Sequence, residues 1–172
     1  MPSRLADDVL KRAFLEARTH RAWAPGEVSD AVLRELIDLM KMGPTASNCQ
    51  PGRITFVKSK AAKERLKPHL NPGNVDKTMA APATAIIGYD LKFYEHPPKG
   101  QDPLSGFADQ PERALTAALR NGSLQGAYLI IAARMLGLDA GPMSGFNNAG
   151  VDGEFFAGTD VKSNFLCNLG YG

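Results

Sequence analysis

Four short polar segments, each at the end of an apolar stretch, carry the side chains best suited to ligand chemistry. Arg18-Thr19-His20-Arg21 places two guanidinium groups and a hydroxyl within four residues, a set that suits an anion. Ser47-Asn48-Cys49-Gln50 is a row of hydrogen-bond donors and acceptors. Asn74 and Lys77 share one face of a helix, and Met143-Ser144-Gly145 offers backbone N–H groups beside a soft apolar side chain.

Taken singly, each segment also has a simpler interpretation. Arg and Lys at helix ends commonly stay solvated or complement the helix dipole, and amides beside a proline commonly form turns. Gly145 could serve only for its backbone dihedral, and Met143 could fill the core. The residues alone leave both interpretations open, because a sequence does not show which segments converge in space.

Other reactive groups have no partners at the spacing their chemistry needs. The sequence has no dinucleotide-binding G-x-G-x-x-G, phosphate-binding loop, H-E-x-x-H or G-x-S-x-G, so a kinase, zinc hydrolase or serine esterase is unsupported. The three histidines stand on different elements, and we expect no metal site. Cys49 has no neighbouring base that would make it a nucleophile, and we expect Cys49 and Cys167 to be free thiols.

Composition narrows the class of protein. The chain has 172 residues, which suits one domain, and it shows no repeat or linker. Its 20 basic and 18 acidic side chains give a net charge of +2, so we expect no nucleic-acid partner. The longest uncharged apolar stretch, 121–133, is shorter than the roughly 18 residues of a membrane helix. No secretory signal begins the sequence, and we expect a cytoplasmic protein with no membrane partner.

Hydrophobic periodicity and capping residues predict the elements that position the polar segments. In the first half of the chain, these elements are a helix capped by Ser3 and ending at Arg18, a helix capped by Ser29 or Asp30 and stopped by Gly43-Pro44, a strand at 53–58, a helix from Ser59 to about Pro68, a helical turn at 74–79 and a buried strand at 83–89.

The second half begins with a long loop, Phe93 to Gln110, which we expect to border a substrate pocket. Pro111 then opens a helix to Leu136 whose middle is apolar nearly all round, a pattern typical of a helix at the centre of a fold. A Gly-Pro turn at 141–146, a short helix with Phe155 and Phe156, and a strand at 162–171 complete an α+β or α/β alternation.

The order of four motifs resembles one family. The run RTHRAW, then GPTASNCQP, GNVDKTMAAPA and GLDAGPMSGF, is similar to the nitroreductase family of FMN-dependent NAD(P)H oxidoreductases, from about Asp8 to Gly172. RTHRAW, RNGSLQGAYLI and LGLDAGPMSGF are most similar to a subgroup described as malonic semialdehyde reductases and as NADH dehydrogenase/nitroreductases. The resemblance implies an α+β nitroreductase-like fold, with a mostly antiparallel sheet flanked by helices around the central apolar helix.

The resemblance also implies roles for individual residues. Arg18 and Thr19 would contact the ribityl phosphate, while Arg21 and Lys77 would lie beside N1 and the C2 carbonyl of the flavin. Asn74 would bond the pyrimidine edge. The remaining implied contacts are Met143, Ser144 and Gly145 at the flavin face or N5 edge, and Ser47, Asn48 and Gln50 reaching the partner subunit's cofactor.

As a member of this family, the protein would be a homodimer with two shared FMN sites. It would pass hydride from NADH or NADPH through flavin N5 to a small acceptor in a ping-pong reaction, with no side-chain nucleophile. A nitroaromatic, a quinone or a small aldehyde such as malonic semialdehyde could be the acceptor. The alternatives are a non-catalytic protein that stores FMN and a structural dimer that binds no ligand.

Two departures from the family pattern are visible. Many members carry an acidic residue where Ser144 stands, which affects the contacts expected at the N5 edge. Relatives also continue with a C-terminal arm, whereas this sequence ends at Gly172 in what reads as a strand. We therefore expect the natural protein to extend past Gly172 with a segment that is basic near the phosphate.

Overall fold

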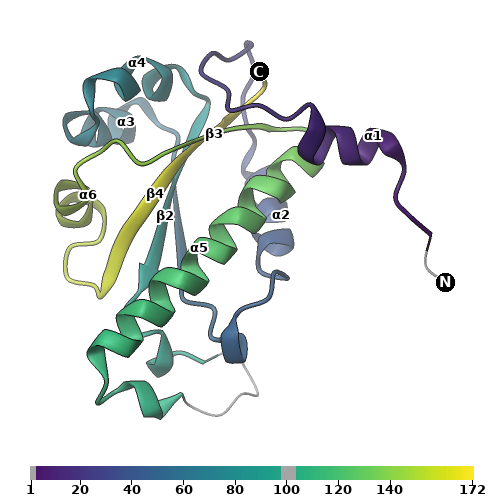
Figure 1. The fold of residues 1–172 in the computed structure, drawn as a ribbon. Helices are drawn as coiled ribbons and strands as arrows, with labels where there is room; N and C mark the ends of the chain where they lie inside the picture. Colours follow the sequence, from purple (N-terminus) through teal and green to yellow (C-terminus); the bar gives the residue numbers. More distant parts are fainter. Residues whose placement is uncertain (1–2, 98–103) are drawn as a thin grey trace.

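The fold of the chain is described by a computed structural model for residues 3–97 and 104–172 (Figure 1). Its α-helices and strands, in chain order, are α1 (Asp7–Leu10), α2 (Asp30–Met40), β1 (Gly52–Val57), α3 (Lys60–Leu66), α4 (Pro72–Ala80), β2 (Ala83–Asp90), α5 (Pro111–Met135), β3 (Asp139–Met143), α6 (Asn148–Phe155) and β4 (Val161–Gly170). A π-helical stretch, η1 (Lys11–Leu15), continues α1, and single 3₁₀ turns are η2 (Ala46–Asn48), η3 (Lys67–His69), η4 (Phe93–Glu95) and η5 (Ser105–Phe107).

The four strands form one sheet in the order β1-β2-β4-β3, and every neighbouring pair is antiparallel. The predicted antiparallel sheet is therefore confirmed. β4, the last strand in the chain, lies between β2 and β3, with Ala85 opposite Cys167 and Gly141 opposite Asn168. This insertion leaves β1 and β3 as the edges of the sheet.

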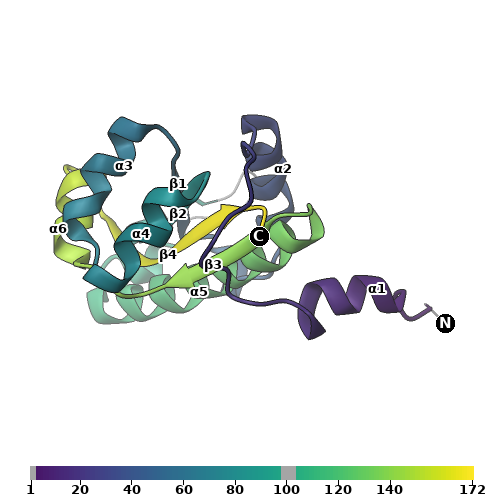
Figure 2. The same cartoon turned by 90° about the horizontal axis from the view of Figure 1, so that it is seen from above.

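A hydrophobic core lies on each face of the sheet. On one face, side chains of α2 and α5 pack against alternate residues of β2 and β4, including Ala85, Ile87 and Cys167. On the other face, α3 and α6 pack against Ile86 and Leu166. Figure 2 shows α3, α4 and α6 grouped together, and α1 extending away from the other elements. The alternation of side chains along each strand thus separates two helical layers.

Helix α5 differs from its prediction in one respect. It contacts all four strands and α2, as expected of the central helix. Its other side is exposed, however: Leu124 is 45% exposed and Tyr128 39%, and Leu115, Leu119 and Met135 are exposed in the same way. In a single chain the helix is therefore not enclosed on all sides, and an apolar face of α5 is left uncovered.

Local capping signals predicted most helix starts correctly. The Ser29 hydroxyl accepts from the Val32 N–H at 3.3 Å, and the Ser59 hydroxyl accepts from the Ala62 N–H at 3.1 Å. Ser3, by contrast, caps nothing, because the first helix begins at Asp7 after Ala6 and closes in the π-helical turn η1, before Arg18. The helix predicted to end at Arg18 is thus shorter, and Arg18 lies in the segment after it.

Two further predictions need correction. The expected turn at 74–79 is the nine-residue helix α4, which Pro72 opens at its first position. The first part of the expected Gly-Pro turn at 141–146 belongs to strand β3, in which Pro142 lies opposite Cys167 of β4. β3 is an edge strand, which is where a sheet tolerates a residue without an N–H donor.

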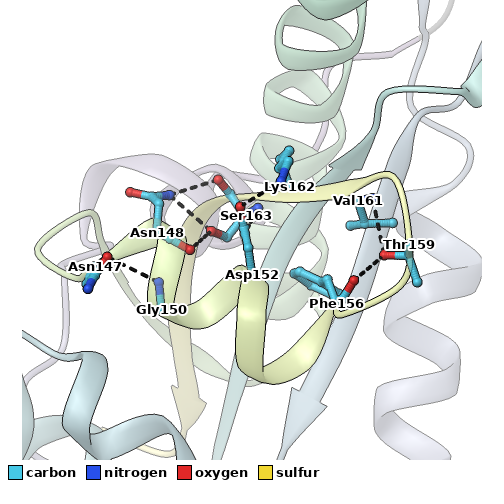
Figure 3. A network of polar contacts seen from close by, with 9 residues as sticks. All are labelled: Asn147, Asn148, Gly150, Asp152, Phe156, Thr159, Val161, Lys162 and Ser163. Carbon is cyan, nitrogen blue, oxygen red and sulfur yellow. Dashed lines mark hydrogen bonds and ion pairs between the residues drawn. The ribbon is translucent and has the colours of Figure 1, made fainter.

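Polar contacts hold α6 against β4 (Figure 3). The Asn148 amide donates to the Ser163 carbonyl oxygen at 2.8 Å, and the Ser163 N–H donates to the Asp152 carboxylate at 2.7 Å. Asn147 caps the helix by accepting from the Gly150 N–H at 3.2 Å. Because α6 follows β3 after only four residues, these bonds also restrain the Ser144-Gly145 connection.

The segment 93–110 is partly ordered by its own aromatic residues. Phe93 is fully buried, and its ring lies 5.1 Å from that of Phe107 in an edge-to-face contact. The turns η4 and η5 stand where no regular structure was predicted, and residues 98–103 of the predicted loop lie outside the described residues. Within the described ranges, no helix is both long and apolar enough to cross a membrane.

Candidate functional site

The segment that contains Arg18 and Arg21 lies along the edge strand β3. Thr19 forms a parallel bridge with Ala140, and the His20 N–H donates to the Ala140 carbonyl oxygen at 3.1 Å. A Cβ atom on Gly141 would lie 2.6 Å from the His20 carbonyl oxygen, so this close approach requires glycine. Tertiary pairing, and not a helix end, therefore positions Arg18, Thr19 and Arg21.

Helix α4 brings Asn74 and Lys77 to the same edge. The Trp23 indole N–H donates to the Lys77 carbonyl oxygen at 3.1 Å, which joins the segment 18–23 to α4. The Asn74 amide donates to the Gly145 carbonyl oxygen at 2.7 Å. A Cβ on Gly145 would lie 2.6 Å from the Asn74 amide nitrogen, so a larger residue would displace this contact. Three of the four polar segments thus meet at one edge of the sheet.

The cationic side chains of this edge are available to an anion. Arg18 and Arg21 are exposed and Lys77 is half-buried. None of the three forms an ion pair with any acidic side chain of the described ranges, and Arg18 only donates to the Ala17 carbonyl oxygen at 3.1 Å. Unpaired cations beside Asn74 and the backbone of Ser144 and Gly145 form a donor set that suits a phosphate and a polar ring edge.

Beneath this edge lie polar residues that the sequence analysis did not select. Asn168 and Thr78 are fully buried, and the Asn168 amide donates to the Thr78 hydroxyl at 3.2 Å and to the Lys77 carbonyl oxygen at 3.3 Å. The Thr78 hydroxyl donates a hydrogen bond to the Met143 sulfur at 3.6 Å. A lone amide in the apolar run Phe165 to Leu169 is the signal that could have identified Asn168.

The fourth polar segment is elsewhere in the chain. Figure 1 shows the blue turn η2 (Ala46–Asn48) beside the lower half of α5, at the end of the sheet opposite to the C-terminus and α4. The Asn121 side chain accepts from the Ala46 N–H at 2.8 Å, and the Gln50 amide donates to the Asn48 side chain at 2.7 Å. Ser47, Asn48 and Gln50 therefore do not join the other eight predicted site residues within one chain.

The backbone of this fourth segment is unusual. Ser47, Asn48 and Gln50 have φ values of 49°, 50° and 38°, in the left-handed region that favours glycine. A hollow of about 540 Å³ lies beside Ser47, and Arg113, Arg120 and Phe107 are among its lining residues. Strained residues at a hollow are typical of a functional position, so the segment keeps its place among the candidates.

The two cysteines are unsuited to nucleophilic chemistry. Both are buried and free. Burial raises the pKa of Cys49 and raises the pKa of Cys167 to about 12, because the thiolate loses its hydration. The prediction of free thiols without a nucleophilic role is consistent with these shifts.

A second hollow, of about 520 Å³, contains none of the predicted site residues. It lies between α2 and β1, and Leu33, Ile37 and Phe56 provide its apolar lining. Lys58 lies 2.6 Å from Asp30 at its rim and holds the pKa of that carboxyl below its usual value. The Lys58 ammonium at this hollow is thus already paired with a carboxylate, unlike the cations at the β3 edge.

Comparison with known proteins identifies the family to which this chain belongs. The sequence profile of the nitroreductase family matches residues 15–171, and the chain belongs to the nitroreductase family. A relative from Burkholderia lata named "Putative NADH dehydrogenase/NAD(P)H nitroreductase" is 58% identical over 171 residues, which cover 98% of this chain and 88% of the relative.

Solved structures with much lower identity share the fold. A structure from Exiguobacterium sibiricum, described as a "putative nitroreductase in complex with FMN", has a TM-score of 0.80 at 18% identity and covers 99% of this chain and 90% of that one. A nitroreductase family protein from Streptococcus pneumoniae has a TM-score of 0.81 at 17% identity, covering 95% and 88%. The predicted α+β nitroreductase-like fold is confirmed.

Proposed function

We propose that this protein is an FMN-dependent oxidoreductase that uses NADH or NADPH. One observation carries the proposal: the segment with Arg18 and Arg21 lies along β3 and is joined to α4, which carries Lys77. None of these three cations has an acidic partner within the described ranges. A cationic edge with a neighbouring amide and exposed backbone matches the chemistry of a phosphorylated flavin. Family membership and the name of the Burkholderia lata relative support the same function.

The residues of this edge would divide the cofactor between them. Arg18 and Thr19 would bind the phosphate, which carries nearly two negative charges. Asn74 would bond the pyrimidine ring, beside which Arg21 and Lys77 would hold positive charge. When bound, FMN would supply two-electron transfer between NAD(P)H and an acceptor. The two cations would stabilise negative charge on that ring and so favour its reduction.

Met143, Ser144 and Gly145 would contact the opposite ring edge. The Gly145 carbonyl oxygen already accepts from the Asn74 amide and from the Asn71 N–H, so we expect the backbone N–H groups of Ser144 and Gly145, and not this oxygen, to contact a ligand. Ser144 provides a neutral hydroxyl at this edge, so we expect its side chain to add no negative charge beside the ring.

The complete site would form in a homodimer. The apolar face of α5, which includes Leu124 and Tyr128, is exposed in one chain and would be buried by association. Ser47, Asn48 and Gln50 lie apart from the cationic edge of their own chain, so they would act on the partner's cofactor. The same arrangement explains why their strained turn is exposed in a single subunit.

We propose a small electrophile as the acceptor. A nitroaromatic, a quinone and an aldehyde such as malonic semialdehyde all fit a site without a side-chain nucleophile. The hollow beside Ser47 and the segment 93–110 would determine which acceptor is used. Replacing the segment 93–110 by a short linker should change acceptor selectivity while FMN stays bound. The reaction needs no membrane or nucleic acid, and we expect it to take place in the cytoplasm.

Flavin binding and turnover test this function separately. The purified chain should show flavin absorbance and bind FMN more tightly than riboflavin, which lacks the phosphate. Arg18→Ala should lower the ratio of the riboflavin to the FMN dissociation constant by about ten- to hundredfold, the range expected for the loss of one charge-assisted contact. Oxidation of NADH or NADPH should then depend on an added nitroaromatic or quinone.

The two alternative functions predict different results. A flavin-storage protein would bind FMN but would not oxidise NAD(P)H with any acceptor. A structural dimer would bind neither FMN nor riboflavin. Equal affinities for FMN and riboflavin would remove Arg18 and Thr19 from the phosphate site even if the protein is active.

A further inference from the structure

Lys63 is a buried ammonium group without an acidic partner. It lies on α3, is 3% exposed and forms no ion pair with the acidic residues of the described chain. Its Nζ donates to the Thr78 carbonyl oxygen at 2.5 Å, the Ala81 carbonyl oxygen at 2.8 Å and the Thr84 hydroxyl at 2.9 Å. A buried charge of this kind is costly unless its hydrogen bonds are complete, and here all three N–H groups are used.

Two of the acceptors are at the C-terminal end of α4. The helix ends at Ala80, Ala81 leaves it in an extended conformation, and Pro82 has no N–H with which to cap the last carbonyl groups. Lys63 takes the place of the missing backbone cap by bonding Thr78 and Ala81. Its charge also faces the negative end of the helix dipole, which strengthens these bonds.

The third hydrogen bond begins a chain with a fixed direction. The Thr84 hydroxyl accepts from Lys63 and donates to the Asn168 side-chain oxygen at 2.7 Å. The Asn168 amide in turn donates to the Thr78 hydroxyl, and that hydroxyl donates to the Met143 sulfur. Each member donates away from Lys63. The ammonium therefore determines which way the hydroxyl groups and the amide point.

The chain ends on residues of the proposed cofactor site. The Asn168 amide also donates to the Lys77 carbonyl oxygen, which accepts the Trp23 indole N–H as well. The Met143 sulfur accepts the last hydrogen bond of the chain, from the Thr78 hydroxyl. Lys63 thus bonds the backbone at the end of α4 directly. It reaches Lys77 through two buried side chains, Thr84 and Asn168, and reaches Met143 through a third, Thr78.

We propose that Lys63 is a positioning residue of the flavin site, which fixes the C-terminal end of α4 and, through Thr84, Asn168 and Thr78, holds Lys77 and Met143 where the cofactor binds. This inference rests on the proposed function. It adds a residue from α3, an element that none of the four sequence motifs includes. It also assigns a purpose to a buried charge that the core would not otherwise need.

Three variants separate this role from general stability. Lys63→Met keeps the length and removes the charge and all three donors. Thr84→Val keeps both bonds to α4 and interrupts only the chain to Asn168. Lys60→Met, on the exposed side of the same helix, is the matched control. Each variant is prepared as the full chain, with folding checked by circular dichroism.

FMN affinity and the midpoint potential of bound FMN are the first readouts. Lys63→Met should raise the FMN dissociation constant about tenfold, the effect of losing one good charge-assisted contact, and should make the potential more negative. Thr84→Val should change both in the same direction by less, and Lys60→Met should change neither. A lower unfolding temperature in Lys63→Met with unchanged affinity and potential would overturn the proposal. If Lys63→Met does not fold, an unchanged FMN affinity and midpoint potential in Thr84→Val would overturn the proposal instead.

Hydrogen exchange of the protein without FMN makes the test independent of the proposed function. Lys63→Met should exchange faster within residues 74–81 and 143–145, while α6 and Lys60→Met remain as in the wild type. Unchanged exchange, or an equal increase throughout the chain, would contradict a positioning role. Absence of FMN binding by the wild type would refute the proposed function, and this exchange pattern would still decide what Lys63 does.

Discussion

The contribution of Lys63 to the free energy of unfolding should increase as the pH rises. A lysine whose pKa is raised by an acidic partner in the folded state would show the opposite trend. Burial lowers the pKa of Lys63 from 10.5 to about 8 because the charged form loses its hydration. Between pH 8 and 10.5 the unfolded chain therefore binds the proton more fully than the folded chain does. Stability rises with pH wherever the unfolded state binds more protons, so the contribution of Lys63 increases across this range.

The size of the effect follows from the change in pKa. At 1.36 kcal/mol per pKa unit, a fall from 10.5 to about 8 corresponds to about 3 kcal/mol between the two ends of the range. Cys167 acts in the opposite direction from pH 9 upward, since burial raises its pKa from 9.0 to about 12. The total stability therefore does not report Lys63 by itself above pH 9.

A comparison of two proteins isolates the lysine. Urea unfolding followed by circular dichroism, at fixed protein and FMN concentrations, gives the free energy of unfolding of the wild type and of Lys63→Met at each pH. Cys167 contributes equally to both and cancels in the difference. The wild type should gain about 3 kcal/mol relative to the variant between pH 8 and 10.5, with no gain between pH 6 and 7. A difference that stays constant or declines over the upper range would refute the buried-ammonium interpretation.

Three further outcomes are expected. Arg21→Ala should weaken FMN binding about tenfold or more and make the midpoint potential more negative, because positive charge beside the pyrimidine ring is lost; unchanged values in a flavin titration and potentiometry would exclude Arg21 from the site. Gly145→Ala should cost about 1–3 kcal/mol in urea unfolding and reduce FMN affinity, since its Cβ would lie 2.6 Å from the Asn74 amide nitrogen. Leu124→Glu should convert a dimer to a monomer in light scattering, whereas Ala61→Glu on α3 should not; a monomeric wild type would contradict the proposed assembly.

Several elements could be predicted from the sequence because their signals are local. The caps at Ser29 and Ser59 lie within three residues of the N–H groups that they bond, and Pro111 opens α5 through its own fixed φ. The apolar run 83–89 becomes the buried strand β2. The polar segments around Arg18, Asn74 and Ser144 were also recognisable, since residue type and order suffice for a motif.

The convergence of those segments depends on contacts between distant residues. Thr19 meets Ala140, and Trp23 meets Lys77, only because the last strand inserts between β2 and β3 and leaves β3 at the edge. The same insertion explains why Pro142 is in a strand, where a Gly-Pro turn was predicted. Strand order is set by packing across the whole sheet, and no local pattern reports it.

Lys63 shows the limit of sequence reasoning most clearly. In the sequence it is one of two lysines on a short helix, although its spacing of three from Leu66 places it toward the apolar side. Its burial depends on the end of α4 and on Thr84, which lie 15 to 21 residues further along the chain. Periodicity and capping determine which segments form helices and strands. The tertiary structure decides which polar groups are removed from water, because that depends on every element packed around them.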